Sequence, residues 1–336
     1  MIRKNKRVTL KDIAAEAGVS MMTVSNVLNG RGSVSRDTSQ RVTEIARRLN
    51  YRPNQVARSL RVEETRTLGV VVSDSSQLVL AKVIRAIESE AAQAGYSVIV
   101  ANTDQSPQRE KAAIELLLNK RIDGLLLAAP LNTDDSQIRT LVHFGVPLVL
   151  LMRSSRSVPV NSVVNDNERG GYEIVRHLIQ TGRHPIRFLS LPQASQSGQS
   201  RIAGYRRAFQ EAGLNWCDAA VCHCQPDIAS GYEAMSQWLE AAPCTGAVCC
   251  GCDLIAVGAI RAIQDRGLAV PGDLAVSGYD DIDLAEYLCV PLTTMRQPKD
   301  ELGREGVRML LEQIRDPGHE PRQIVLPSTL IVRSSA

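Results

Sequence analysis

Residues 9–29 read Thr-Leu-Lys-Asp-Ile-Ala-Ala-Glu-Ala-Gly-Val-Ser-Met-Met-Thr-Val-Ser-Asn-Val-Leu-Asn, a pattern that predicts two short helices joined by a turn. Apolar residues recur at helical spacing in the first helix, at Leu10, Ile13, Ala14 and Ala17. Gly18 can then leave the helix with a positive φ, and Ser20 is a good N-cap for the second helix. We expect that second helix to bury Val24, Val27 and Leu28.

The residues that follow predict a third helix. Asn29–Gly32 reads as a loop and Ser35 can cap the helix, whose apolar face comprises Val42, Ile45, Ala46 and Leu49. Two helices joined by a glycine-containing turn form a helix-turn-helix, whose second helix fits the major groove of DNA. An ordinary helical hairpin has the same spacing, so the surrounding charge decides between the two interpretations.

The charge of the chain is unevenly distributed. Residues 1–66 hold 14 Lys and Arg against 6 Asp and Glu, whereas the rest of the 336 residues hold 25 against 30. A basic head on a mildly acidic body is typical of a phosphate-binding module joined to a small-molecule sensor.

The length predicts two or three domains, and no stretch is apolar enough for a membrane helix. We therefore expect a cytoplasmic protein with an all-α helix-turn-helix headpiece at residues 1–50.

From Leu68 onward, short apolar runs alternate with amphipathic segments. Strands are predicted at 68–72, 97–101, 124–128 and 148–151, and again at 186–189, 220–222, 247–250 and 274–277. Helices are predicted near 80–94, 107–120, 134–144, 168–181, 201–212, 230–240 and 254–267. This alternation predicts parallel doubly wound α/β sheets, and two such sets predict two lobes. Ligands bind beyond the carboxyl ends of such strands, so we expect a site in the cleft between the lobes.

Several motifs occur along the chain in a recognisable order. They are Val8–Ala14, Ala17–Ser20, Thr23–Ser25, Tyr51–Leu60, Arg121–Gly124, Arg201–Tyr205, Ala256–Ala259, Ser277–Asp281 and Pro291–Thr294. In these motifs the chain resembles the LacI/GalR (lactose-repressor) family of bacterial transcription factors over essentially its whole length. The resemblance implies a regulator, in most cases a repressor, that binds a palindromic operator as a dimer and responds allosterically to a small-molecule effector.

The resemblance also implies the domain organisation. Residues 68–336 would form an effector-binding and dimerisation domain like the periplasmic sugar-binding proteins. Lobe one would span about 68–164 and 296–325, and lobe two about 165–295 and 326–336, with a last strand near 323–332 directed toward lobe two. No heptad segment follows that strand, so we expect a homodimer.

Residues 51–67 read as a hinge helix and linker. Pro53 limits the third helix, and Asn54 can cap a short run that ends at Leu60 and is too short to be stable alone. The resemblance implies that this helix orders on operator DNA, where Arg58 contacts the DNA and Leu60 wedges into the minor groove. Burial within a helix is the alternative for Leu60, but its polar and basic neighbours disfavour it.

Base recognition is predicted at the start of the second helix. Family members read base edges at the positions of Met21 and Met22, and Asn26 lies one turn further on. Methionine suits a thymine methyl or the shape of a base edge, whereas Asn26 can pair with N6 and N7 of adenine. Burial in the small core is the alternative for the two methionines. Phosphate contacts are predicted for the short polar groups of Thr9, Ser20, Thr23, Ser25, Asn29, Ser35, Thr38, Tyr51 and Asn54.

In the sensor, Arg201 and Asp280 match the positions at which the family most often binds its effector. We expect each to follow a strand and to face the cleft. An arginine fork binds hydroxyls, carboxylates or phosphates, and a carboxylate accepts from sugar hydroxyls or base nitrogens. Asp253 also lies just past a strand, where a helix N-cap is an equally good interpretation, and Arg153 ends the fourth strand.

Departures from the family pattern narrow the range of candidate effectors. Aromatic residues are common in the family at two places where this chain has Gln77-Leu78 and Pro226, and only 4% of all residues are aromatic. By this resemblance we expect Gln77 and Leu78 to contact the effector. Without a stacking platform a purine is less suited, and Arg153 and Arg201 add weight to a sugar acid or a phosphosugar. The sequence therefore favours a sugar, a sugar acid or a phosphosugar, with a nucleobase corepressor as the alternative.

Seven of the eight cysteines fall within residues 217–252, in runs that include Cys222-His223-Cys224 and Cys249–Cys252. Thiolates at this density suit zinc or copper. In a doubly wound lobe, however, a common strand separates the two cysteine-bearing strands by about 10 Å. We therefore predict buried apolar thiols, with no metal and no cofactor. Cys252 is also a candidate effector contact, because it lies at a strand tip where the family often has asparagine.

Other classes of protein fit less well. The five histidines are scattered, and no His-Glu-x-x-His, Gly-x-Ser-x-Gly or phosphate-loop motif occurs, which disfavours an enzyme. A periplasmic binding protein needs a signal peptide, but Lys11 and Asp12 interrupt any apolar region behind the basic start. An architectural DNA-binding protein would not need so large a sensor.

Overall fold

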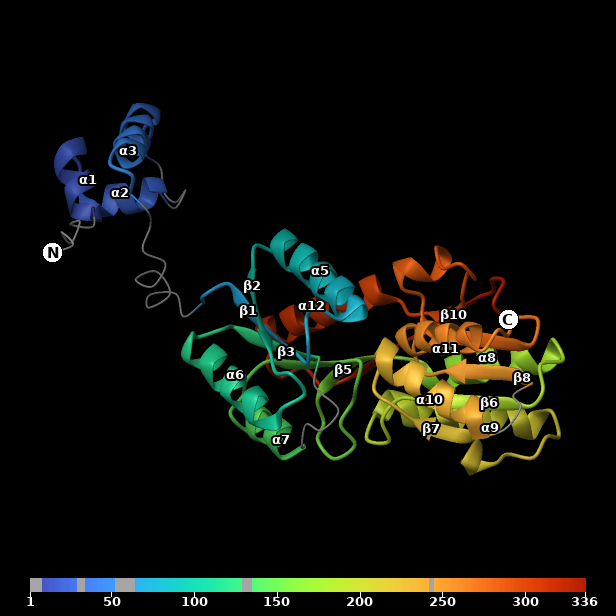
Figure 1. The fold of residues 1–336 in the computed structure, drawn as a ribbon. Helices are drawn as coiled ribbons and strands as arrows, with labels where there is room; N and C mark the ends of the chain where they lie inside the picture. The colour runs from blue at the N-terminus through green and yellow to red at the C-terminus, as the bar shows by residue number, and fades with distance from the viewer. Residues whose placement is uncertain (1–7, 29–33, 52–63, 129–134, 242–244) are drawn as a thin grey trace. The chain divides into compact units, whose positions relative to one another are not determined.

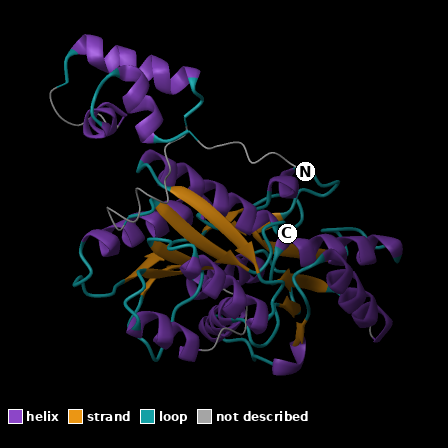
Figure 2. Ribbon diagram, turned by 90° about the vertical axis from the view of Figure 1, so that its left-hand side faces the viewer, coloured by secondary structure: helices purple, strands orange, loops and turns teal. Residues whose placement is uncertain are grey.

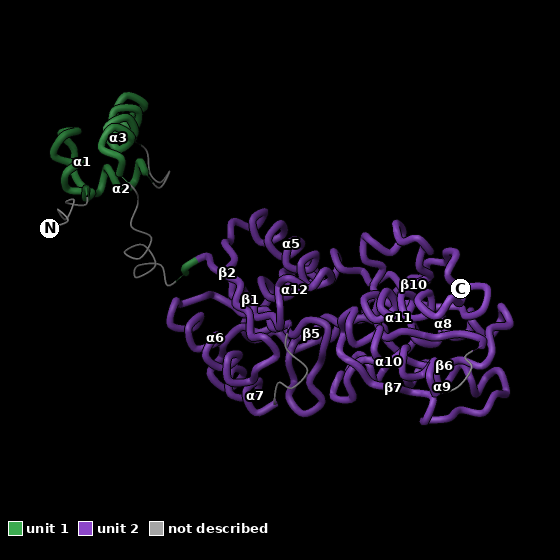
Figure 3. The backbone as a smooth tube through the Cα atoms, viewed as in Figure 1, with its two compact units in different colours: residues 1–65 green, residues 66–336 purple. Residues whose placement is uncertain are grey.

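The computed structural model describes residues 8–28, 34–51, 64–128, 135–241 and 245–336. The chain divides into two compact units, Met1–Thr65 and Arg66–Ala336, which Figure 3 distinguishes by colour. Among the described helices, none is long and apolar enough to cross a membrane.

The first unit contains three helices, α1 (Leu10–Ala17), α2 (Met21–Leu28) and α3 (Arg36–Arg48). A capping box begins α1, in which the Thr9 N–H donates to Asp12 Oδ2 at 2.8 Å. Gly18 ends α1 in the left-handed region at φ 65°, as its position predicted. The helices close on a small core of Ile13, Ala14, Ala17, Val24, Val42, Ile45 and Ala46, with Val27, Leu28 and Leu49 at its edge.

The second unit holds two six-stranded sheets in two lobes. Lobe one contains β1 (Thr67–Val72), α5 (Leu78–Gln93), β2 (Ser97–Asn102), α6 (Pro107–Asn119), β3 (Gly124–Ala128), α7 (Asp135–His143), β4 (Leu148–Leu151), β5 (Asn161–Asn165), α12 (Lys299–Arg315) and β11 (Gln323–Leu326). Lobe two contains α8 (Asn167–Gln180), β6 (Ile186–Ser190), α9 (Gln196–Glu211), η1 (Asp218–Ala220), β7 (Val221–His223), α10 (Ile228–Ala241), β8 (Gly246–Cys250), α11 (Asp253–Asp265), β9 (Leu274–Asp280), η2 (Asp283–Glu286), β10 (Thr293–Arg296) and β12 (Thr329–Ile331). Figure 1 shows these elements along the chain.

Both sheets have the strand order of doubly wound folds. The first runs β11-β5-β4-β3-β1-β2 and the second β12-β10-β9-β8-β6-β7. Every pairing among the described strands is parallel except that of β10 with β12. The predicted fold class, a helix-turn-helix unit with a two-lobed parallel α/β sensor, is therefore confirmed.

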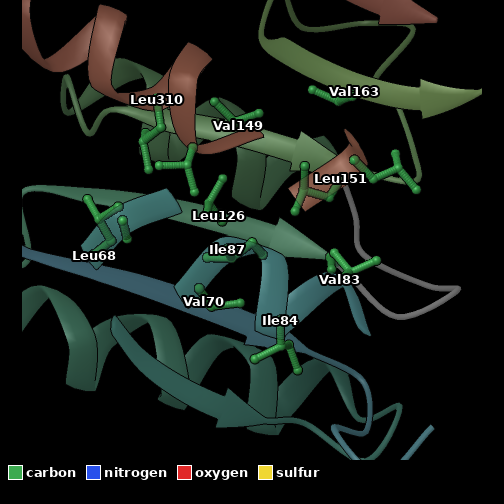
Figure 4. Close-up of a cluster of buried hydrophobic side chains, with 14 of the residues drawn as sticks. Leu68, Val70, Val83, Ile84, Ile87, Leu126, Val149, Leu151, Val163 and Leu310 are labelled. Atoms are coloured by element: carbon green, nitrogen blue, oxygen red, sulfur yellow. The ribbon is translucent and has the colours of Figure 1, made fainter. Parts of the chain in front are cut away.

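Helices cover both faces of each sheet, which Figure 2 shows as purple layers around the orange strands. Strand β1 shows why the sequence reads as one apolar run: Val70 faces the layer of α5 and α12, whereas Val71 faces α6 and α7. Strands buried on both faces need apolar side chains at every position. Figure 4 shows the first of these layers, in which Ile87 of α5 and Leu310 of α12 pack over Leu126 and Val149.

Two features differ from the sequence-based expectation. The single last strand expected near 323–332 is two short strands, β11 in the first sheet and β12 in the second. Pro327 lies between them and cannot donate a ladder hydrogen bond, which explains the break. The strand β5, Asn161–Asn165, was not predicted because polar residues occupy three of its five positions, although four of the five are buried.

The chain passes between the two lobes three times. These crossover segments are residues 165–167 between β5 and α8, residues 296–298 between β10 and α12, and residues 326–328 between β11 and β12. The first and third lie together, because the Asp166 N–H donates to the Leu326 carbonyl at 2.8 Å. Each crossover therefore lies beside the carboxyl end of a strand, which is where a ligand site is expected.

Candidate functional site

Helix α2 presents to solvent the residues that we predicted to read bases. Met21 and Met22 are 54% and 74% exposed, so the alternative of burial in the small core is wrong. Asn26 is partly exposed, while Val24 on the opposite side of the helix is fully buried. The methionines are thus large apolar side chains on a solvent-facing helix end, a position suited to contact with a partner surface.

Several of the predicted phosphate-contact groups lie at the starts of helices. Ser20 Oγ accepts from the Thr23 N–H at 3.0 Å at the start of α2, and Ser35 Oγ accepts from the Thr38 N–H at 3.3 Å at the start of α3. Helix N-termini attract anions, so these hydroxyls lie where phosphates bind well. The groups described at or near the surface are Thr9, Ser20, Thr23, Ser25, Ser35, Thr38 and Tyr51. Asn29, Asn54, Arg58 and Leu60 lie outside the described residues.

In the second unit, a cavity of about 260 Å³ lies between the two lobes. We call it the interlobe cavity. Lobe one contributes the polar residues Ser73, Gln77, Gln105 and Arg153, and the segments of lobe two together with the 296–298 crossover contribute Ser195, Gln196, Ser197, Arg201, Asp280 and Gln297. Leucine, isoleucine, valine, proline, alanine, methionine and Cys252 line the rest, and none of the described lining residues is aromatic.

Arg201 lies within helix α9 and does not follow a strand, contrary to expectation. The helix begins earlier than predicted because Ser195 caps it, with Ser195 Oγ accepting from the Gly198 N–H at 3.1 Å. Two glycines bring α8 and α9 together at the backbone. A Cβ on Gly171 would lie 2.4 Å from the Arg201 carbonyl oxygen, and one on Gly204 would lie 2.0 Å from a carbonyl of α8.

The guanidinium of Arg201 is buried, at 3% exposure, and is held by three groups. Its Nε donates to Asn167 Oδ1 at 3.0 Å, and its Nη1 donates to the Gly251 carbonyl. Its Cζ lies 3.5 Å from the centre of the Tyr279 ring, a cation–π contact. These contacts fix the orientation of the arginine fork, and the residue also lines the cavity.

Asp280 ends strand β9 and lines the same cavity. Its Oδ1 accepts from Gln297 Nε2, and its carbonyl oxygen accepts from Lys299 Nζ. Burial raises the pKa of Asp280, although the positive charges of Arg201 and Lys299 act in the opposite direction. The carboxyl therefore keeps one oxygen occupied by the protein, and its neighbours partly balance its charge.

Arg153 follows β4 and faces the cavity from lobe one. Burial lowers its pKa, while Glu110 and Asp135 raise it. Its Nη2 lies 3.7 Å from Asp135 Oδ1. The Asp135 carboxylate accepts from the Ser157 hydroxyl at 2.6 Å, a bond that keeps its pKa below the usual range. Two acidic groups thus surround this cation.

Six of the seven predicted effector residues line the interlobe cavity: Gln77, Leu78, Arg153, Arg201, Cys252 and Asp280. Asp253 does not line it. Its carboxylate is fully buried and accepts from Thr294 Oγ1 at 2.5 Å and from the Ile282 N–H at 2.8 Å. The alternative N-cap role also fails, because Cys252 is the N-cap of α11. Asp253 instead links the segment that follows β9, at Ile282, to Thr294 of β10.

Sequence reasoning missed Gln297, Gln196 and the serines of the cavity wall. Gln297 directly follows β10, so the rule that ligand residues follow strands could have found it. Gln196 bridges the lobes, because its Oε1 accepts from the Ser154 N–H at 3.3 Å and its Nε2 donates to the Ser154 carbonyl at 3.1 Å. No spacing rule signals a contact of that kind between distant segments.

The prediction of buried thiols in strands is met in part: Cys249 and Cys250 of β8 are buried, whereas Cys222 of β7 is half-buried and Cys217 is exposed. Cys222 of β7 and Cys250 of β8 both pair with Leu189 of β6, so one strand separates the two runs. Burial raises the pKa of Cys224 to about 12 and that of Cys249 to about 11. In the part of the chain that the structure describes, no three His, Cys, Asp or Glu side chains are placed to hold a metal ion.

Comparison with known proteins agrees with this geometry. Residues 65–334 match the family described as periplasmic binding proteins and sugar binding domain of LacI family, and residues 9–54 match bacterial regulatory proteins, lacI family. The repressor PurR of Vibrio campbellii is 37% identical and covers 97% of this chain and 98% of its own length. The ribose operon repressor of Haemophilus influenzae is 35% identical with 97% of this chain and 98% of its own length covered.

A solved structure extends the similarity to three dimensions. The crystal structure of the lac repressor dimer bound to operator and the anti-inducer ONPF superposes with a TM-score of 0.90 at 32% identity. The match covers 98% of this chain and 99% of that one, so both units have counterparts there.

Proposed function

The chain belongs to the LacI family of bacterial regulatory proteins and is a DNA-binding transcriptional repressor; from this premise we propose that it binds a palindromic operator as a homodimer controlled by a small polar metabolite. The headpiece residues Met21, Met22 and Asn26 would read the bases. The interlobe cavity would bind the metabolite between Arg201 and Asp280.

The observation that carries the effector proposal is the balance of charge in the cavity. Arg153 is accompanied by Glu110 and Asp135, and Arg201 is accompanied by Asp280. Neither cation presents an uncompensated positive charge to an anion. Amide and serine side chains, together with Arg153, Arg201 and Asp280, instead supply both donors and acceptors, which a neutral polyhydroxylated molecule needs. Within the class of sugars, sugar acids and phosphosugars we therefore favour a neutral sugar.

A nucleobase corepressor is the second candidate. The aliphatic side chains of Leu78, Leu191, Leu254 and Ile282 line the cavity and could enclose a planar ring, and Asp280 could accept from a ring N–H. The absence of an aromatic side chain from the described lining weighs against it, because stacking on an aromatic face is the stronger way to hold a base.

The test uses four probes: D-ribose, D-gluconate, D-glucose 6-phosphate and hypoxanthine. Thermal unfolding of the full-length protein identifies which of them binds, because a ligand specific to the folded state raises Tm. Fluorescence anisotropy on an operator selected from randomised DNA then measures the change in operator affinity. We expect the neutral sugar to give the largest shift in Tm and to change operator affinity about 5–150-fold. A shift only with the two anions would contradict the charge argument, and binding without any change in operator affinity would contradict effector control.

A further inference from the structure

We propose that three buried amide side chains, Asn165, Asn167 and Gln297, couple the effector pair Arg201 and Asp280 to the crossover segments between the lobes. This inference rests on the proposed function, because it assigns a route to the control that the effector exerts. The amides are positioning residues. They transmit a change at the cavity to the segments about which the lobes move.

The route from Asp280 runs through Gln297. Gln297 is 3% exposed, and its Nε2 donates to Asp280 Oδ1 while its Oε1 accepts from Asn165 Nδ2. An amide nitrogen only donates and an amide oxygen only accepts, so these two bonds fix the orientation of the Gln297 side chain. Gln297 belongs to the second crossover and Asn165 to the first. A displacement of the Asp280 carboxylate therefore displaces side chains of the first and second crossovers.

The route from Arg201 runs through Asn167. Asn167 Oδ1 accepts from Arg201 Nε at 3.0 Å, and its Nδ2 donates to the Asn165 carbonyl at 3.3 Å. Arg201 also reaches the third crossover through the ring beneath its guanidinium, because the Tyr279 hydroxyl donates to Ser328 Oγ at 3.3 Å. All three passages between the lobes thus lie within one or two side chains of the effector pair.

Burial raises the cost of breaking the hydrogen bonds of this network. Asn165, Asn167, Gln297, Arg201 and Asp280 are each at most 9% exposed, so water does not readily replace a broken bond. A ligand that draws Arg201 or Asp280 toward itself must either break a hydrogen bond to one of the amide side chains or rotate a crossover segment. Rotation of the crossover is favoured, because it changes backbone torsions at three short segments and breaks no hydrogen bond of the network.

One group in the network is left over. Asn165 Oδ1 is buried and has no hydrogen-bond partner among the described residues. A buried unsatisfied acceptor is costly, so an arrangement of the lobes that brings a donor to it gains stability relative to the present one. The network therefore has a physical basis for two alternative states.

The first experiment measures the link without any ligand. Hydrogen exchange of the Asp166 amide, which donates to Leu326 across the first and third crossovers, is followed by mass spectrometry with fragmentation on the full-length protein. Asp280→Ala should speed this exchange roughly tenfold, the effect of losing a buried bond to a charged group. In a Gln297→Met background, Asp280→Ala should change the rate less than twofold, because the link is already cut.

The matched control is Gln313→Met. Gln313 Oε1 accepts from the Leu148 N–H at 3.1 Å and from Asn161 Nδ2 at 3.2 Å, so this variant also loses a bridging amide, but within lobe one. Here Asp280→Ala should retain its full tenfold effect. If Gln297→Met does not fold, Gln297→Glu serves in its place, since it keeps the acceptor for Asn165 and loses the donor to Asp280. Equal tenfold effects in all backgrounds would overturn the proposal.

A second experiment uses Asn165→Leu, which cuts the network at a residue outside the cavity lining. With D-ribose as the probe, the dissociation constant should stay within about threefold of wild type while the response of operator affinity falls at least tenfold. A full response would overturn the proposal. If the wild-type protein itself binds D-ribose without a response, the proposed function fails, and the exchange experiment still decides whether the amide network links cavity and crossovers.

Discussion

Replacement of Arg201 by alanine should reduce both the stability of the fold and the response to the effector. The loss of stability can be worked out from the contacts of the guanidinium. Arg201→Ala removes a cation that is 3% exposed and leaves Asn167 Oδ1 and the Gly251 carbonyl without their donor. Asp280 also loses a buried positive neighbour. Removal of one partner from a buried ionic arrangement costs about 3–5 kcal/mol.

That cost translates into a large change of melting temperature. For a unit of this size, about 2–4 °C is lost per kcal/mol, so Arg201→Ala should lower Tm by roughly 6–20 °C. Arg201→Lys keeps a positive charge but not the planar fork, so it should recover part of the stability without the effector response. Circular dichroism gives Tm, and anisotropy on operator DNA gives the response.

The control lies on the same helix. Arg207 is exposed, bonds Glu211 at 3.0 Å and lies 4.6 Å above the Tyr172 ring, so Arg207→Ala removes similar contacts at the surface. Solvent screening should leave Tm almost unchanged. A Tm of Arg201→Ala within 2 °C of wild type would refute the argument that the buried cation supports lobe two.

The remaining predictions concern three other positions. Asn26→Ala should cost roughly 1–3 kcal/mol on the preferred operator and relax one base position per half-site, which a selection from randomised DNA would detect. Leu60→Ala should reduce operator bending and affinity while effector binding persists, and equal bend angles in a circular-permutation assay would contradict this. Asp253 has a pKa raised by burial from 3.8 to about 7, so the folded state retains a proton that the unfolded state has released between these values. Stability should therefore fall as pH rises from about 4 to 7 and level off above, by up to about 1.4 kcal/mol per pH unit, whereas Asp253→Asn should show a flatter profile in urea unfolding.

Local patterns predicted most of the fold. Val70 and Val71 in β1, or Ala247 and Val248 in β8, face opposite layers, and such strands are recognisable because every position is apolar. The strand β5 was missed since its buried Asn161 and Asn165 read as loop residues. Their amides bond Gln313 and Gln297, partners more than a hundred residues away that no local pattern reveals.

The residues of the interlobe cavity were likewise predictable only in part. Arg201 and Asp280 came from family motifs, and strand ends pointed to Asp253, but position after a strand does not tell which way a side chain turns. Asp253 faces Thr294 and the Ile282 amide, away from the cavity. Gln297 follows β10, so the same rule could have indicated it, but its bond to Asn165 joins segments 132 residues apart and no local pattern reveals it.

The turn that carries Asp280 explains why its position responds to the spacing of the lobes. Asp280 and Asp281 have φ values of 129° and 50°, a left-handed backbone that costs L residues roughly 1–3 kcal/mol each. Arg296 and Arg333 bind the Asp281 carboxylate at 2.6 and 2.8 Å, and Lys299 Nζ donates to both turn carbonyls. Lys299 begins α12, which packs on the first sheet, whereas the turn ends a strand of the second. The strain is therefore offset in part by a contact that requires the present lobe spacing. A motion that withdraws α12 removes the two Lys299 bonds, while Arg296 and Arg333 stay on the Asp281 carboxylate. The carboxyl group that faces the cavity therefore lies on a segment of lobe two whose support comes in part from lobe one.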